Sequence, residues 1–205
     1  MTPIVLIGGG GHCESCIDVI EQQGTYQIAG IVDMPDKIKK SVAGYPIIAD
    51  DSKIEELANQ YPCFLITVGQ IKSPLKRMKL FKYLQELNLQ LPVIISPCAY
   101  VSKRAQIGPG TIIHHHAVVN SGARIGSNCI INTKAIVEHH VVIEDTVHIS
   151  TGAILNGSAQ VGEGTFVGSG AIVRESIKIG KQCIIGSGIR VMQSLESGQI
   201  LKTSR

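Results

Sequence analysis

Residues 131–155 read INTKAIVEHHVVIEDTVHISTGAIL, and this stretch decides the fold of the second half of the chain. Ile, Val or Leu stands at every sixth position, and the spacing continues without a break from Ile95 to Val191. A helix needs apolar residues at a period near 3.6 and a flat strand at a period of 2, so neither explains this repeat. Short strands coiled around a narrow apolar core do explain it. The repeat therefore predicts a parallel β-helix.

The same repeat relates residues that are far apart in the sequence. If three hexapeptides form one coil, residues one coil apart should stack about 4.8 Å from each other. Gly157 then lies beside His139, because the two are 18 residues apart. Cys129 and Cys183 share a column three coils apart, which at about 14 Å is too far for a disulfide. We expect both cysteines in the core.

Composition limits the class of protein. The formal charge of +3 is small and the basic residues are dispersed, which argues against nucleic-acid binding. No apolar run approaches the roughly 20 residues of a membrane-spanning helix, so we expect no membrane insertion. The N-terminus lacks the pattern of a signal peptide, and the six cysteines form no disulfide framework. These features predict a cytoplasmic protein.

Residues 1–94 follow a different pattern, in which strands and helices alternate. We expect strands at residues 4–7, 28–32, 63–68 and 92–95, and helices at about 12–22, 51–60 and 74–87. Ser73 and Pro74 are expected as the N-cap and first residue of the last helix. Such alternation predicts a Rossmann-like α/β domain before the β-helix, which we assign to residues 95–205.

The first expected strand and helix are joined by the run Gly8-Gly9-Gly10-Gly11-His12. Backbone N–H groups of such a loop can bind a phosphate at the helix N-terminus, and Asp33, at the end of the second strand, suits a ribose or base. The third glycine of the dinucleotide pattern is replaced by Cys13. A nucleotide-type ligand and a purely structural tight turn both remain open. His12 could contact the ligand or simply begin the helix.

Six of the seven histidines lie between positions 114 and 148. A zinc site like that of the β-helical carbonic anhydrases needs a close histidine pair about five residues apart, and no pair here has that spacing, so we expect no metal. For His114, His115 and His116 we favour solvated turn positions. The C-x-x-C formed by Cys13 and Cys16 is expected to be structural rather than redox-active.

His139 is the candidate general base, because a glycine one coil away leaves room for a substrate and could offer backbone N–H groups to an oxyanion. His148 is nine residues further on, half a coil, so the two histidines should point to different sides of one β-helix. They can share a site only if neighbouring subunits each contribute one. This arrangement predicts a homotrimer with sites between chains.

The glycine-rich turn ending at Gly11-His12, the Gly69 turn and the hexapeptide array carrying Asn132-Thr133 and Val137-Glu138-His139 resemble one family over nearly the whole chain. This is the sialic acid O-acetyltransferase family of sugar acyltransferases, near the N-acetyltransferases of nucleotide-linked 4-amino sugars. The resemblance implies a left-handed β-helix, a homotrimer, a nucleotide sugar as acceptor and acetyl-CoA as donor. The site residues that it implies are Gly10, Gly11, His12, Asp33 and Gly69 for the substrate, His139 and Gly157 for catalysis, and His148, Ser169 and Ser187 for acetyl-CoA.

The family usually has an acidic residue directly after the catalytic histidine, whereas this chain has His140. Either Glu138 or His140 would then support His139. The resemblance favours N-acetylation of a nucleotide-linked 4-amino-4,6-dideoxy sugar in bacterial surface glycan synthesis. The alternatives are O-acetylation of sialic acid or a related sugar, and, from another class, a non-catalytic module that binds nucleotide sugars.

Overall fold

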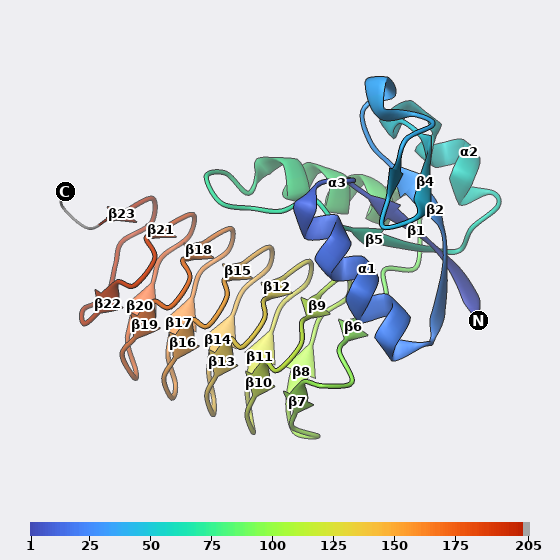
Figure 1. Ribbon diagram of the computed structural model, residues 1–205. Coiled ribbons are helices and arrows are strands. Elements are labelled where there is room, and N and C mark those ends of the chain that lie inside the picture. Colours follow the sequence, from blue (N-terminus) through green and yellow to red (C-terminus); the bar gives the residue numbers. More distant parts are fainter. Residues whose placement is uncertain (203–205) are drawn as a thin grey trace.

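The computed structural model describes residues 1–202, whereas residues 203–205 of the predicted second domain lie outside the described part of the chain. An α/β part comes first and a stack of short strands follows (Figure 1). The elements of the α/β part are β1 (Thr2–Ile7), α1 (Gly11–Gln23), β2 (Tyr26–Val32), η1 (Pro35–Lys37), β3 (Ser41–Val42), β4 (Tyr45–Ala49), η2 (Asp51–Lys53), α2 (Ile54–Ala58), β5 (Cys63–Ile66) and α3 (Leu75–Glu86).

The five strands of the α/β part form a sheet in the order β3-β4-β2-β1-β5, in which all pairs except β3–β4 are parallel. Alternate side chains of β1 enter two different cores. Ile4 and Leu6 pack with α1, whereas Val5 and Ile7 pack with α2 and α3. Helices therefore cover both faces of the sheet, as the alternation of strands and helices predicts.

Four details differ from the sequence-based expectation. The strand expected at residues 92–95 covers only Ile94–Ile95 and pairs with Ile112–Ile113, so it belongs to the β-helix rather than to the sheet of the α/β part. The hairpin β3–β4 is not predicted, because its turn is Ala43-Gly44, both with positive φ, rather than the usual Asn-Gly signal. The helix expected at residues 51–60 is split into η2 and the short α2. α3 begins at Leu75, one residue later than expected, with the Ser73 hydroxyl accepting a bond from its N–H.

The rest of the chain is a left-handed parallel β-helix made of strands of two residues each. These strands are β6 (Ile94–Ile95), β7 (Tyr100–Val101), β8 (Gln106–Ile107), β9 (Ile112–Ile113), β10 (Val118–Val119), β11 (Arg124–Ile125), β12 (Ile130–Ile131), β13 (Ile136–Val137), β14 (Val142–Ile143), β15 (His148–Ile149), β16 (Ile154–Leu155), β17 (Gln160–Val161), β18 (Phe166–Val167), β19 (Ile172–Val173), β20 (Lys178–Ile179), β21 (Ile184–Ile185), β22 (Arg190–Val191) and β23 (Ile200–Leu201).

Three parallel sheets form the sides of this β-helix. Their strand orders are β23-β21-β18-β15-β12-β9-β6, β22-β19-β16-β13-β10-β7 and β20-β17-β14-β11-β8. Paired residues such as Val119 and Val137 are 18 positions apart, so one coil is three hexapeptides, as predicted. The repeat residues fill the core, which also contains Cys129 and Cys183 as free thiols.

The chain turns each corner through a residue in the left-handed region. Positive φ values occur at every sixth position from Gly110 to Gly188, and several of these positions are not glycine. One of them is His140, with a φ of 58°. The residue before each such position, for example His139, points away from the core, whereas the residue after it, for example Val141, is buried in the core.

The α/β part packs against one face of the β-helix, so that α1 runs beside β6 and β9 (Figure 1). Ile94, Ile112 and Ile130 of the seven-stranded sheet share a buried cluster with Ile17 and Ile20 of α1. This contact brings the first turn of α1 next to an edge of the β-helix. Within residues 1–202, no helix has both the length and the apolar character needed to cross a bilayer.

Candidate active site

The loop after β1 carries the glycines that the sequence suggests for substrate binding. Gly8 has a φ of 107°, and a Cβ at this position would lie 2.5 Å from the Val68 side chain, so the loop requires glycine here. Gly10 is the N-cap of α1 and makes no side-chain capping bond. The N-terminus of α1 is therefore available to an anion.

Asp33 holds this loop from the end of β2. Its carboxylate accepts bonds from Gly9 N (2.9 Å), Met34 N (2.8 Å) and Lys37 Nζ (2.9 Å). Burial by itself would raise the pKa of Asp33, but the bonds from Lys37, Met34 and Gly9 outweigh it and lower the pKa. Asp33 is therefore an anion that positions both the loop and a lysine.

A cavity of about 370 Å³ lies between this loop, the turn that follows β5 and the start of α3. All five residues expected around the substrate line it, namely Gly10, Gly11, His12, Asp33 and Gly69. Lys37 and Lys76 also line it and provide the positive charge that a diphosphate needs. The structure therefore brings the predicted residues to one cavity, and their role in binding remains a prediction.

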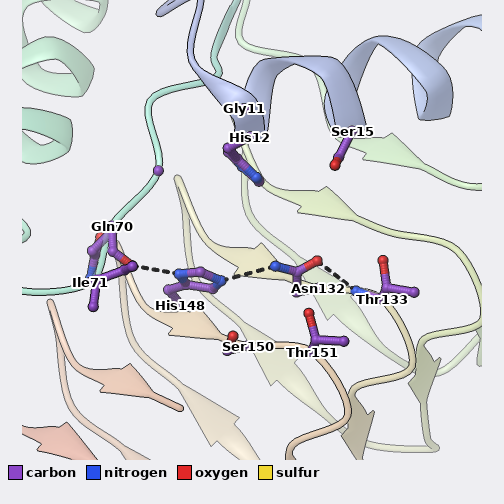
Figure 2. Close-up of a pocket in the computed structure, with 11 residues that line it drawn as sticks. Gly11, His12, Ser15, Gln70, Ile71, Asn132, Thr133, His148, Ser150 and Thr151 are labelled. Atoms are coloured by element: carbon purple, nitrogen blue, oxygen red, sulfur yellow. Dashed lines mark hydrogen bonds between the residues drawn. The ribbon is translucent and has the colours of Figure 1, made fainter. Parts of the chain in front are cut away.

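A second cavity, of about 640 Å³, separates α1 from the edge of the β-helix. Figure 2 shows His12 and Ser15 of α1 facing His148 and Thr151 of the β-helix across this space. Gly11, His12 and Gly69 line both cavities. The two spaces are therefore neighbours, which suits a reaction between two bound molecules.

His148 occupies the floor of the larger cavity on β15. Its Nδ1 donates to Gln70 O (2.6 Å), which leaves Nε2 to accept from Asn132 Nδ2 (3.3 Å) (Figure 2). Burial lowers the pKa of His148 to about 4, against the raising effect of the Gln70 bond. The imidazole is thus neutral at neutral pH and fixed in one tautomer. The family resemblance implies only that it contacts acetyl-CoA.

Several residues of this cavity are missed by the sequence reasoning. They are Ser15, Gln70, Ile71, Ser150 and Thr151, while Asn132 and Thr133 belong to the quoted family motif but are given no role there. One available signal was the column of strand residues containing His148, whose neighbours one coil away are Ile130 and Phe166. A histidine in an otherwise apolar outward column indicates that this side is covered by the α/β part.

Ser169 and Ser187, the other residues expected near acetyl-CoA, do not line the cavity but continue its edge. Thr133 and Thr151, one coil apart, line the cavity. Backbone hydrogen bonds connect successive turns at this corner: Gly152 N donates to Thr133 O, Gly170 N to Thr151 O and Gly188 N to Ser169 O. Ser169 also bonds through its hydroxyl to Ser150 (2.9 Å). A row of small polar residues therefore leads away from the cavity along one corner of the β-helix.

His139 and Gly157 are stacked as the period of six predicts. A Cβ built on Gly157 would lie 2.6 Å from His139 Cε1 and 2.7 Å from Nε2, so the ring lies directly over the glycine backbone. His139 O accepts from Ser158 N (2.9 Å), whereas the N–H of Gly157 has no acceptor within residues 1–202. This N–H is therefore available to a ligand beside the imidazole.

The two candidate partners of His139 differ in what they contact. Glu138 Oε2 accepts from Asn120 Nδ2 (2.9 Å) and from the backbone N–H of His139 (3.2 Å). The ring of His139 instead meets His140, with 3.2 Å between the two Nδ1 atoms. His140 in turn lies over Gly122, where an added Cβ would lie 2.8 Å from its ring. The side-chain partner of His139 within the chain is therefore a second imidazole.

His139 and His148 belong to different sides of the β-helix, as expected. His139 follows β13 of the six-stranded sheet, and His148 lies on β15 of the seven-stranded sheet. The corner after β13 leads to the five-stranded sheet, away from the cavity that contains His148. One chain therefore does not bring the two histidines together.

The expectation of solvated histidines is wrong for His114. This residue is fully buried, because α1 packs over the corner after β9. His115 bonds to Asp18 of α1 (2.7 Å) and to Ser96 (2.6 Å), and only His116 is exposed. Cys13 and Cys16 are buried, and burial raises the pKa of both thiols, which is the reverse of an activated redox pair.

Comparisons with known proteins agree with this architecture. The PglD N-terminal domain family matches residues 3–84. A histidine-to-asparagine variant of perosamine N-acetyltransferase from Caulobacter crescentus, solved with CoA and GDP-perosamine, has 30% identity and a TM-score of 0.92, covering 98% of this chain and 93% of that chain. The acetyltransferase domain of PglB from Neisseria gonorrhoeae, solved with acetyl coenzyme A, has 31% identity and a TM-score of 0.89, covering 97% of this chain and 94% of that chain.

WeeI from Acinetobacter baumannii shares the fold, with a TM-score of 0.86 at 22% identity over 98% of this chain and 96% of that chain. No curated protein matches the chain in a sequence comparison. A glycine-loop α/β part joined to a left-handed β-helix defines a hexapeptide-repeat acyltransferase. The chain belongs to the family of nucleotide-amino-sugar acetyltransferases that includes perosamine N-acetyltransferase.

Proposed function

We propose that the protein transfers the acetyl group of acetyl-CoA to the amine of a nucleotide-linked amino sugar. The observation that carries this proposal is the pair of neighbouring cavities that share Gly11, His12 and Gly69. The full-length similarity to perosamine N-acetyltransferase, which was solved with CoA and GDP-perosamine, supports the same pair of ligands.

The nucleotide sugar would bind in the smaller cavity. Its diphosphate would lie at the N-terminus of α1, next to Gly10 and Gly11, with Lys37 and Lys76 nearby. We assign this role to a nucleotide-sugar-binding domain of residues 1–94 and acyl transfer to a β-helical domain of residues 95–205. Asp33 would act mainly by holding Gly9 and Lys37 in place, since its oxygens already accept their bonds.

Acetyl-CoA would lie along the corner of the β-helix that leads into the larger cavity. Ser169 and Ser187 continue the row that Thr133 and Thr151 begin, and the pantetheine arm of CoA is a long chain with amides that suit such a row. His148 would contact the donor in the cavity, where its neutral ring and the neighbouring Asn132 are already oriented.

His139 would act as the general base. It takes a proton from the neutral sugar amine as the nitrogen attacks the thioester carbonyl, the tetrahedral intermediate then expels the CoA thiolate, and the protonated imidazole returns the proton to that thiolate. The N–H of Gly157, beside the ring, could bond to the oxyanion. His140 is the better candidate to support His139, because Glu138 bonds to Asn120 and to backbone rather than to the ring.

A homotrimer with the site between chains is part of the proposal. Its support is geometric, since the corner that carries His139 and the cavity that contains His148 lie on different sides of one chain. A neighbouring copy could place its His139 at the open side of this cavity. The cytoplasmic location also remains a proposal, supported by six free cysteines.

The finer identity of the acceptor is proposed as a 4-amino-4,6-dideoxy sugar. The alternatives are O-acetylation of sialic acid or a related sugar, because one base could serve an amine or a hydroxyl, and binding of a nucleotide sugar without catalysis. Thiol release from acetyl-CoA, measured with GDP-, UDP- and dTDP-linked 4-amino sugars and with free sialic acid, separates these possibilities. We expect turnover only with a nucleotide-linked amine, and turnover with free sialic acid alone would overturn the proposal.

The same assay tests the base. His139→Ala should lower kcat by about 10²–10⁴-fold, the usual contribution of a positioned base. His116→Asn is the control, because His116 is an exposed histidine at a different corner of the β-helix and lines neither cavity. Full activity in His139→Ala would contradict the assignment of this residue, while loss in both variants would indicate a general effect on the fold.

A further inference from the structure

One cluster of possible metal ligands lies where α1 meets the β-helix and consists of His12, Cys16 and His114. His12 also lines the two proposed cavities, whereas Cys16 and His114 are buried and have no role in the proposed reaction. His12 and Cys16 are four residues apart on one face of α1, and His114 comes from the corner after β9, about a hundred residues further along the chain. One donor atom from each side chain lies within 4.8 Å of the others.

The distances fit one tetrahedral metal ion. His12 Nε2 and Cys16 Sγ are 3.5 Å apart. Bonds of about 2.1 Å to nitrogen and 2.3 Å to sulfur, at the tetrahedral angle, place two such ligands about 3.6 Å apart. The rings of His12 and His114 have centroids 5.3 Å apart and are tilted by 48° rather than stacked. Both rings can therefore direct a nitrogen toward a common point.

A hydrogen bond from the thiol would explain the contact between His12 and Cys16, but it does not explain His114. This side chain is 0% exposed, and neither of its ring nitrogens has a hydrogen-bond partner within residues 1–202. An imidazole buried in this way loses its bonds to water without replacement, which costs about 1–3 kcal/mol. An ion bound by His114 would supply the missing partner.

We propose that His12, Cys16 and His114 form a binding site for a divalent transition metal of the zinc class, which ties α1 to the β-helix. Two nitrogens and one thiolate are a common zinc donor set, and the fourth position would face the larger cavity, which His12 also lines. The metal would stabilise the contact between the two parts of the chain rather than take part in acetyl transfer.

In such a site both imidazoles would bind as neutral rings and Cys16 would bind as a thiolate, so the thiol proton would be released when the ion enters.

Metal binding can be measured without acetyl-CoA or sugar, so the test is independent of the proposed reaction. The full chain carrying Cys98→Ser, which removes the exposed thiol, is titrated with Co²⁺ and then with competing Zn²⁺. We expect one equivalent of Co²⁺, a thiolate-to-cobalt charge-transfer absorption and displacement by Zn²⁺. Absence of the charge-transfer band, with the protein folded by circular dichroism, would overturn the proposal.

Variants assign the ligands. Cys16→Ser keeps a hydroxyl that can bond to His12 but lacks the thiolate, so it should lose the charge-transfer band and bind Zn²⁺ about 100-fold more weakly. His114→Phe fills the same buried space without nitrogen and should also bind more weakly. The matched control is Cys13→Ser, at a buried cysteine of α1 outside the cluster, which should bind as the parent does.

Melting temperature gives a second measurement, because an ion that binds only the folded chain stabilises it. Zn²⁺ should raise the melting temperature of the parent and of Cys13→Ser, but not that of Cys16→Ser. If the parent and Cys16→Ser bind Zn²⁺ equally tightly, the three residues are not the site, and the contact between Cys16 and His12 is a hydrogen bond only.

Discussion

The ring of His139 lies over the backbone of Gly157 one coil further along the β-helix, so close that a Cβ on Gly157 would meet Cε1 at 2.6 Å. Gly157 has no positive φ, so an alanine here costs little in the backbone. Gly157→Ala should therefore displace the imidazole. We expect kcat to fall by about 10- to 100-fold, with an unchanged melting temperature, because small displacements of reacting groups are costly.

The control for this prediction is a double-mutant cycle. In a His139→Ala background, Gly157→Ala should have almost no further effect on kcat, because the ring that it displaces is gone. Equal losses in both backgrounds would mean that Gly157 acts independently of His139, for instance through its own N–H.

His140 stands where an acidic residue would stabilise the protonated base. With 3.2 Å between the Nδ1 atoms, the second imidazole can orient His139 but carries no negative charge when neutral. In His140→Glu, a carboxylate would stabilise the imidazolium, so the acidic limb of the kcat/KM profile should move to higher pH. Glu138→Gln, which can still accept a hydrogen bond from Asn120, should not move the acidic limb of the kcat/KM profile. A shift of this limb in Glu138→Gln would identify Glu138 as the partner of His139.

His148 is fixed between Gln70 and Asn132 in the larger cavity. His148→Asn can still donate to Gln70 O but no longer fills the cavity floor. The variant would lose about one hydrogen bond to acetyl-CoA. This loss should raise KM for acetyl-CoA about 10-fold, with a smaller change in kcat. Steady-state thiol release at varied acetyl-CoA measures this, and an unchanged KM would remove His148 from the donor site.

Arg77 of α3 joins the α/β part to the β-helix. Its guanidinium is 1% exposed and donates to Ile66 O, Val68 O and both oxygens of Asn128. Burial lowers its pKa to about 10, so it stays charged at neutral pH. Arg77→Met leaves these acceptors without donors and should lower the free energy of unfolding by about 3 kcal/mol in urea denaturation. The exposed Arg104→Met should change it little, and equal effects would contradict this account.

The ionised carboxylate of Asp33 stabilises the fold, and this stabilisation should be lost in acid. Its folded-state pKa is lowered below the usual value of 3.8, so it contributes stability that is present above that value and lost as pH falls through the folded pKa. Asp33→Asn should therefore unfold in less urea than the parent at neutral pH, and the difference should disappear in acid below this range. Asp36→Asn, at an exposed neighbour, should behave as the parent does. A difference that persists at low pH would indicate a cause other than charge.

The period of six predicts the β-helix, the coil of three hexapeptides, the stacking of Gly157 on His139 and the core positions of Cys129 and Cys183, and the structure has all four. These features depend on local strand and turn geometry that repeats, so one register determines every column. The alternation of strands and helices also groups the glycine loop and Asp33, because parallel strands bring their carboxyl ends to one edge.

The contacts between the two parts of the chain cannot be predicted in the same way. The burial of His114 and the bond between His115 and Asp18 depend on α1 packing over one corner, and no local pattern specifies that contact. Gln70 reaches the cavity from the other side, bonding to Thr146 O and Gly164 O of the β-helix. The hairpin β3–β4 is not predicted for a local reason: Ala43 occupies a turn position with positive φ, where Asn, Asp or Gly would be the usual signal.

The amino-acid sequence by itself determined the two architectures and the position of His139 over Gly157, since a strict repeat converts sequence separation into distance along the β-helix. Only the tertiary structure decided which corner α1 covers. The packing of α1 on this face buries Ile17 and Ile20 against Ile112 and Ile130. It also forms the cavity at His148 and encloses His114 beside His12 and Cys16. The reason is physical: apolar burial has no direction, so the face that α1 selects depends on the whole shape of both surfaces.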